Sequence, residues 1–158
     1  MTTQEAFVRE NTAPVTPSLV PELQLCLASE TCPVWLQTPE HFSKLGIPEP
    51  FWAFAWAGGQ ALARYIFDNP EIVYGQTILD FGSGSGIVAI AAAKSGAAHV
   101  VASDIDEYAK AAIAINAKRN NVDIEITREN FIGIDKNWTT VFAADVCYEK
   151  NMSLMINT

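Results

Sequence analysis

The second half of the chain alternates short apolar runs with longer, alanine-rich stretches. The apolar runs predict strands at residues 77–81, 100–103, 124–127 and 141–145. The stretches at residues 86–95 and 106–118 predict the helices that separate the first three strands. Strands that alternate with helices of this length indicate βαβ units and a parallel sheet. The sequence therefore predicts an α/β fold.

The first half of the chain has a less regular pattern. Residues 1–17 are polar and contain Pro14 and Pro17, which is typical of a short helix followed by a linker. Apolar positions within residues 18–28 predict a helix with Ser18 as its N-cap. A short strand at 34–38, a helical turn at 40–45 and a long helix at 51–68, which ends before Pro70, complete the prediction. We expect an N-terminal extension of helices and loops over residues 1–50 and a ligand-binding domain over residues 51–158.

Composition and charge narrow the class of protein. The 158 residues are 49% hydrophobic, as expected of one globular domain. The net charge of −8 argues against a broad nucleic-acid contact, which needs clustered Lys and Arg. Three scattered cysteines and two histidines predict no disulfide framework and no metal site. No apolar run reaches the ~18 residues needed to cross a bilayer, and residues 1–10 resemble no targeting signal, so we expect no membrane partner and a cytoplasmic location.

The first predicted strand leads into a glycine-rich turn. The strand carries Asp80 near its end and is followed by Gly82, Gly84 and Gly86 at alternate positions. Glycines let the backbone turn tightly and approach a ligand, and the next helix would direct its free N–H groups toward that ligand. Asp104 lies 20 residues after Gly84, at the end of the second strand, where an acid can bind a ribose diol. The pattern predicts a nucleoside-cofactor site.

The residues around the turn distinguish between two cofactors. The dinucleotide fingerprint needs glycine at the position that Ile87 occupies here. The carboxylate of Asp80 would repel a pyrophosphate but attract the sulfonium and ammonium groups of S-adenosyl-L-methionine. The turn therefore favours S-adenosylmethionine over NAD. A glycine turn without a ligand is the alternative that the pattern leaves open.

Four segments combine in a recognisable order. They are residues 51–65 (FWAFAWAGGQALARY), the glycine turn, Asp104-Ile105-Asp106, and Asp145-Val146-Cys147-Tyr148. This combination resembles the class I, seven-strand protein lysine methyltransferases, and most specifically the electron transfer flavoprotein β-subunit lysine methyltransferase family. Bacterial relatives are often labelled ribosomal protein methyltransferases. The resemblance covers residues 50–149 and implies a protein substrate, either the electron transfer flavoprotein β subunit or a ribosomal protein.

The resemblance also implies roles for individual residues. The implied cofactor-binding residues are Trp56, Gly59, Asp80, Gly82, Ser83, Gly84, Gly86, Asp104, Ile105, Asn130 and Phe131. The glycine turn and the acid before it would hold the methionine end, Asp104 the ribose hydroxyls, and Ile105 the adenine face. Asn130 would bind the adenine amino edge with Phe131 alongside. Core packing is the alternative for Trp56 and Phe131, and a turn is the alternative for Asn130.

Methyl transfer to lysine asks the enzyme to present a neutral amine in line with the methyl group. A lysine amine has a free pKa of about 10.4, so it must be buried and oriented by a nearby acceptor. We assign the orienting role to Asp145 and Tyr148. An N-cap of a helix after strand four is the alternative role for Asp145.

The family domain has seven strands in the order 3-2-1-4-5-7-6, and four are visible here. We expect a Rossmann-like parallel sheet of order 3-2-1-4 with helices on both faces, preceded by N-terminal helices, with strands five to seven missing. Strand four would be an exposed apolar edge, through which two copies could associate as a homo-oligomer. We expect the cofactor half-site to form, and catalysis only if another chain covers this edge. A small-molecule N-methyltransferase and a non-catalytic cofactor-binding fragment are the alternative functions.

Overall fold

A four-stranded parallel sheet forms the centre of the computed structural model, which describes residues 1–146. Its strands are β3 (Thr77–Phe81), β4 (His99–Ser103), β5 (Glu125–Thr127) and β6 (Thr140–Phe142), in the spatial order β5-β4-β3-β6. This is the predicted order 3-2-1-4, and every pairing within it is parallel. In this register Asp80 lies beside Ala102 of β4 and Phe142 of β6, so the carboxyl ends of these three strands meet at one edge of the sheet.

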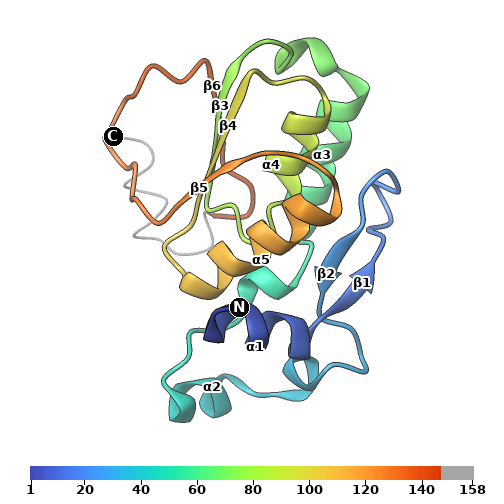
Figure 1. Cartoon of the computed structure of the whole chain (residues 1–158), viewed down its shortest axis with the longest axis vertical. Coiled ribbons are helices and arrows are strands. Elements are labelled where there is room, and N and C mark those ends of the chain that lie inside the picture. Colours follow the sequence, from blue (N-terminus) through green and yellow to red (C-terminus); the bar gives the residue numbers. More distant parts are fainter. Residues whose placement is uncertain (147–158) are drawn as a thin grey trace.

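Three helices cover one face of the sheet (Figure 1): α3 (Ala57–Asp68), α4 (Ile87–Lys94) and α5 (Glu107–Arg119). Nearly all of α4 is buried, because it lies between the sheet and α3. The opposite face is covered in the described chain by the segment between β5 and β6, whose Phe131 and Trp138 pack on Leu79 and Val101. The expectation of helices on both faces is therefore met on one face only within residues 1–146.

The N-terminal segment begins with α1 (Thr3–Asn11), which has a complete capping box between Thr2 and Glu5 and packs on α5. The helix predicted over residues 18–28 is wrong. Strand β2 (Leu25–Leu27) lies there instead and pairs antiparallel with β1 (Ala13–Val15). The N–H groups of Gln24 and Cys26 donate to the side-chain oxygens of Asn120 and Asn116 on α5. These tertiary bonds and full burial override the local helical pattern.

Two other predicted elements also differ. The 3-10 helix η1 (Pro33–Leu36) replaces the strand predicted at 34–38, because Pro33 fixes the backbone at its first position. The long helix predicted at 51–68 is divided into the 3-10 helix η2 (Phe51–Ala53) and α3, with Trp56 as the extended N-cap of α3. The helical turn predicted at 40–45 is confirmed as α2 (Pro39–Leu45), and η3 (Pro70–Ile72) follows α3.

Asn116 joins the N-terminal segment to the glycine turn. Its side chain is fully buried, accepts from Cys26 N at 2.7 Å and donates to Ser85 O at 2.9 Å. Asn116→Ala leaves a buried N–H and a buried C=O without partners and opens a small cavity. We expect the free energy of unfolding to fall by about 2–4 kcal/mol, measured by urea denaturation. Gln24→Ala is the control, because within residues 1–146 the side chain of Gln24 makes a single, exposed hydrogen bond, to Arg119. This substitution should change stability by less than ~0.5 kcal/mol. A loss for Asn116→Ala as small as that of the control would contradict this role.

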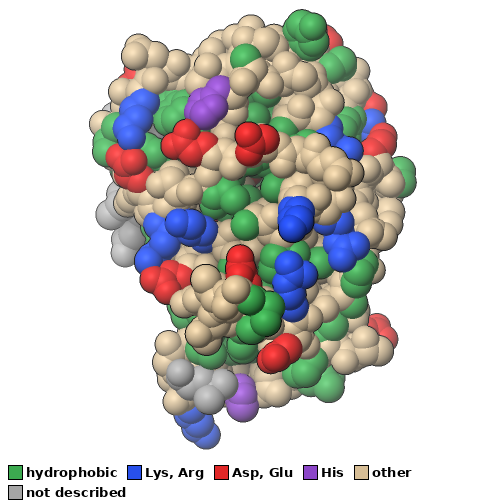
Figure 2. Space-filling model, in the orientation of Figure 1, with side chains coloured by type: hydrophobic (Ala, Val, Ile, Leu, Met, Phe, Trp, Pro, Cys, Tyr) green, Lys and Arg blue, Asp and Glu red, His purple; other side chains and the backbone are tan. Residues whose placement is uncertain are grey.

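The surface and the cysteines can be compared with what a membrane, metal or disulfide protein would show. On the face shown in Figure 2, acidic, basic and hydrophobic side chains are interspersed. Within residues 1–146 no helix is both long enough and apolar enough to span a bilayer. The same residues contain no cluster of His, Cys, Asp and Glu that could hold a metal ion, and both Cys26 and Cys32 are free thiols in the interior.

Candidate functional site

The turn between β3 and α4 is built on left-handed glycines. Gly82, Gly84 and Gly86 have φ angles of +67°, +53° and +83°. A Cβ on Gly84 would come no closer than 3.9 Å to an atom outside its neighbours, so the backbone angle, and not packing, requires glycine there. Within the turn, Gly86 N donates to Ser83 O, and Ser83 N donates to Ser103 O at the end of β4. The turn is therefore anchored to the two central strands.

Asp80 lies buried beneath this turn. Its Oδ2 accepts from the hydroxyl of Ser83 and, at 3.1 Å, from Ala89 N in the first turn of α4. Burial, together with the nearby Asp104, raises the pKa of Asp80 to about 7, against the lowering effect of these two hydrogen bonds. Above this pH a negative charge lies at the N-terminus of α4, and one of the free N–H groups of this helix is already bound by the protein's own carboxyl group.

Asp104, at the end of β4, connects the glycine turn to the start of α5. One carboxylate oxygen accepts from Gly84 N at 2.9 Å and the other from Asp106 N at 3.0 Å. Burial raises the pKa of Asp104. Each oxygen keeps a lone pair for a further donor, such as a ribose hydroxyl. Ile105 follows directly and is 68% exposed, although it is a large apolar side chain.

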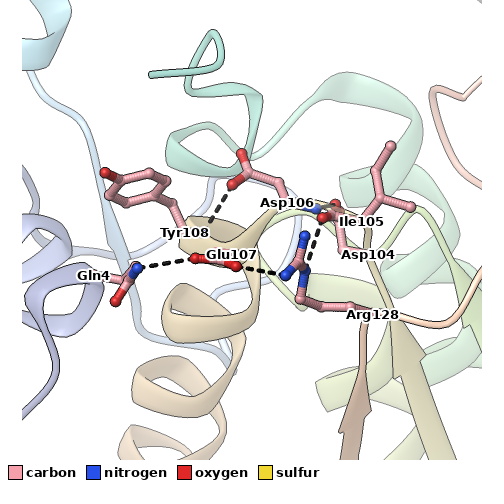
Figure 3. A network of polar contacts seen from close by, with 7 residues as sticks. All are labelled: Gln4, Asp104, Ile105, Asp106, Glu107, Tyr108 and Arg128. Carbon is pink, nitrogen blue, oxygen red and sulfur yellow. Dashed lines mark hydrogen bonds and ion pairs between the residues drawn. The ribbon is translucent and has the colours of Figure 1, made fainter. Parts of the chain in front are cut away.

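The backbone around Ile105 is held by Arg128, Glu107 and Gln4, which belong to no motif identified in the sequence (Figure 3). Arg128 donates from Nε to Ile105 O and pairs with Glu107, which also accepts from Gln4 of α1. Asp106 is the N-cap of α5 and accepts from Tyr108 N. Only the position of Arg128, directly after the third predicted strand, could have indicated that it lies at this edge.

Asp145 lies on the opposite side of the turn, at the N-terminus of α3. Its two oxygens accept from Gly58 N at 3.3 Å and Gly59 N at 2.7 Å. A Cβ on Gly58 would lie within 2.8 Å of this carboxylate, which explains the glycine pair. Asp145 adopts a left-handed φ of +54° and its side chain is exposed. The carboxylate of Asp145 thus binds the N-terminus of α3, which is a different helix from the one after strand four considered above, and it keeps lone pairs for a second partner. Tyr148 and any helix after strand four lie outside the described residues.

Four other residues were predicted to bind the cofactor: Trp56 and Gly59 at the start of α3, and Asn130 and Phe131 after β5. Trp56 is 48% exposed and so is no core residue, and Gly59 is buried against Ile87. Asn130 accepts from Ile132 N, which is the geometry of its alternative role as a turn residue. Phe131 is buried against Trp138 on the helix-free face, which is the geometry of a core aromatic. The adenine roles of Asn130 and Phe131 therefore gain no support from these contacts.

A hollow of about 430 Å³ lies at the other end of the sheet, lined by His99, Val100 and Glu125 among others. It is formed by the N-terminal ends of β4 and β5. Parallel α/β sheets bind ligands at the carboxyl ends of their strands, where the glycine turn, Asp104 and Asp145 come together. We therefore place the functional site at the turn and not at this hollow.

The chain is similar to known methyltransferases. Residues 61–146, which include the turn, Asp104 and Asp145, match the family model described as ribosomal protein L11 methyltransferase (PrmA). The chain is 41% identical over 150 residues to the electron transfer flavoprotein beta subunit lysine methyltransferase of Danio rerio, and 38% identical over 152 residues to that of Homo sapiens. These alignments cover 93% and 94% of the chain and 57% of each relative. The chain therefore spans a little over half the length of these curated relatives.

A solved structure agrees on the fold. The magnesium protoporphyrin IX methyltransferase of Synechocystis superposes with a TM-score of 0.54 at 19% identity, over 63% of this chain and 47% of that one. At this level of identity the match supports the Rossmann-like architecture alone.

Proposed function

We infer the function from the family: the chain belongs to the ribosomal protein L11 methyltransferase (PrmA) family. We propose that it is an S-adenosylmethionine-dependent methyltransferase that acts on a lysine ε-amine of a protein. The named relatives supply two candidate substrates, the electron transfer flavoprotein β subunit and ribosomal protein L11. We propose this methyltransferase activity for the protein as a whole, because the chain spans 57% of the length of each of these lysine methyltransferases.

The observation that supports this cofactor most is the pair of acids around the glycine turn. Asp80 occupies the Ala89 N–H at the start of α4, so a pyrophosphate would find a carboxylate where a dinucleotide site offers free donors. Asp104 is fixed by two backbone N–H groups and has lone pairs left for a ribose diol. Exposed Ile105 lies next to it as an apolar surface for a base. Positively charged S-adenosylmethionine fits this set of groups, and an anionic dinucleotide does not.

When bound, S-adenosylmethionine supplies a methyl group that is already activated by its sulfonium. The chain then has to orient the amine and keep water away. The carboxylate of Asp145 is held in place by Gly58 N and Gly59 N and can accept a hydrogen bond from the substrate amine. We propose that it orients this amine, together with Tyr148.

Transfer of label tests the proposed function. The chain is incubated with S-adenosylmethionine carrying a radioactive methyl group and with a cell extract, and the products are separated on a gel. A labelled protein band is expected, with the label on lysine. Label confined to small molecules would favour a small-molecule N-methyltransferase. Binding of S-adenosylhomocysteine without any transfer would favour a cofactor-binding fragment.

The affinity for the cofactor should depend on pH through Asp80. Its pKa of about 7 means that the carboxylate is charged above this pH and neutral below it. If the charged form binds the ligand's ammonium, calorimetry should show S-adenosylhomocysteine binding about tenfold more weakly at pH 6 than at pH 8. Asp80→Asn should flatten this dependence, whereas Glu107→Gln, which changes an exposed acid, should retain it. Equal affinity of the unaltered chain at both values would count against the charged role of Asp80.

The exposed edge of the sheet supports a proposal about assembly. Among the described strands β6 pairs only with β3, and its Val141 is 53% exposed. An apolar edge of this kind is a template for pairing with another chain. We propose that two copies associate through β6, which sedimentation of the purified chain would detect as a dimer.

A further inference from the structure

A row of partly exposed aromatic side chains leads to the N-terminus of α3. We call Trp35, Phe51, Phe54 and Trp56 the aromatic shelf. Consecutive ring centroids along it are 5.7 Å apart for Trp35 and Phe54, 5.6 Å for Phe54 and Trp56, and 6.2 Å for Phe51 and Trp56. Trp35 and Trp56 are each nearly half exposed, whereas Trp52 of the same segment is buried. Folding thus leaves large apolar rings at the surface in one place, and such a patch marks an interaction site.

The shelf is held in a fixed shape. Trp56 Nε1 donates to Phe51 O at 2.9 Å, and Trp56 is the N-cap residue of α3. Phe54 is half-buried and packs on the N-terminal core. A surface that is rigid before binding loses little conformational entropy when a partner docks.

The residues that follow the shelf in the chain bind the carboxylate of Asp145. Trp56 is followed by Ala57 and then by Gly58 and Gly59, whose N–H groups hold Asp145. The exposed carboxylate of Asp145 is therefore bound to the first turn of the helix for which Trp56 is the N-cap residue. An aromatic face next to an acid attracts a cation that carries an apolar stem.

The chain segment that carries the shelf has a net negative charge. Between residues 29 and 58 the chain has three acids, Glu30, Glu40 and Glu49, all exposed, and one basic residue of fixed charge, Lys44. This net negative charge favours a cationic partner and disfavours an acidic one. Lysine combines an apolar four-carbon stem with a terminal ammonium, so it matches both the rings and the acid.

We propose that the aromatic shelf is the docking surface for the lysine-bearing segment of a protein substrate, and that it directs the lysine side chain toward Asp145. The proposal rests on the proposed function and adds the surface that recognises the substrate. It assigns recognition to Trp35, Phe54 and Trp56, which precede the glycine turn in the chain.

The indole N–H signals of the four tryptophans give a direct test by ¹⁵N–¹H NMR. The probe is the peptide Ac-Gly-Val-Lys-Val-Gly-amide, with its norleucine counterpart as the matched control that lacks the ammonium. Trp35→Phe and Trp56→Phe assign the two exposed indoles. The Nε1 atoms of Trp52 and Trp138 are buried and serve as internal references for an intact fold.

We expect the lysine peptide to shift the signals of Trp35 and Trp56 in a saturable manner, with the references unchanged. The norleucine peptide should bind at least about tenfold more weakly, and Trp56→Ala and Asp145→Asn should each weaken the lysine peptide by about five- to tenfold. Shifts that are equal for both peptides, or no shift at Trp35 and Trp56, would overturn the proposal. S-adenosylhomocysteine affinity of the unaltered chain reports separately on the proposed function, because it depends on Asp80, Asp104 and the glycine turn, which are not part of the shelf.

Discussion

Asp104→Ala is expected to weaken the binding of S-adenosylhomocysteine by at least about 100-fold in calorimetry. The carboxylate is held by Gly84 N and Asp106 N, so its remaining lone pairs point in fixed directions. Each hydrogen bond from a ribose hydroxyl to a charged acceptor contributes about 1.5–3 kcal/mol, and two such bonds are lost. The loss of the bond to Gly84 also frees the glycine turn, which adds to the effect.

The control for this prediction is Glu107→Gln. Glu107 is three residues away and equally acidic, but it is exposed and contacts Arg128 and Gln4. We expect the affinity of the Glu107→Gln variant for S-adenosylhomocysteine to stay within about threefold of that of the unaltered chain. If Asp104→Ala bound as tightly as Glu107→Gln while both remained folded by circular dichroism, the placement of the ribose would be wrong.

Asp145→Ala is expected to lower the rate of methyl transfer to protein by at least about 100-fold. The substitution removes the acceptor that orients the amine, and orientation of reacting groups accounts for large rate effects. Because Asp145 is separated from the ribose-binding acid by the whole glycine turn, the affinity for S-adenosylhomocysteine should change by less than about threefold. The measurement is the initial rate of label transfer together with calorimetry.

Two further variants separate orientation from helix capping. Asp145→Ala also removes the acceptor for Gly58 N and Gly59 N, which costs about 1 kcal/mol of stability. Asp145→Asn keeps one oxygen for this cap and should retain more stability than activity. Asp123→Asn alters an exposed acid at the other end of the sheet and should leave the rate unchanged. A normal rate for Asp145→Ala at saturating substrate would remove this residue from the mechanism.

The fold was predictable where a local pattern and its tertiary setting agree. The alternating strands and alanine-rich helices from residue 77 onward appear in the predicted order, because the central strands β3 and β4 are apolar and largely buried. The segment at residues 18–28 was not predictable in this way. Its structure depends on Asn116 and Asn120, about 90 residues later, whose amides satisfy the backbone of β2. No pattern within residues 18–28 indicates these long-range hydrogen bonds.

The site was predictable to a similar extent. Glycine spacing and an acid at each strand end correctly indicated that Asp80, Asp104 and the turn lie together, since parallel strands end at one edge. The structure also shows that Asp80 is buried and accepts a hydrogen bond from Ala89 N of α4. The sequence pattern does not indicate these two features, because they depend on the orientation of the Asp80 side chain. The roles of Asn130 and Phe131 followed from the family resemblance, but Asn130 forms a turn and Phe131 packs on the face of the sheet that no helix of residues 1–146 covers.

We propose that the acids around the glycine turn select a nucleoside that carries an ammonium group over an anionic dinucleotide. Isothermal titration of the purified chain with S-adenosylhomocysteine and with NAD, at pH 8 and matched ionic strength, tests it most directly. We predict saturable one-to-one binding of S-adenosylhomocysteine and no detectable heat from NAD. Tight binding of NAD without binding of S-adenosylhomocysteine would contradict the account.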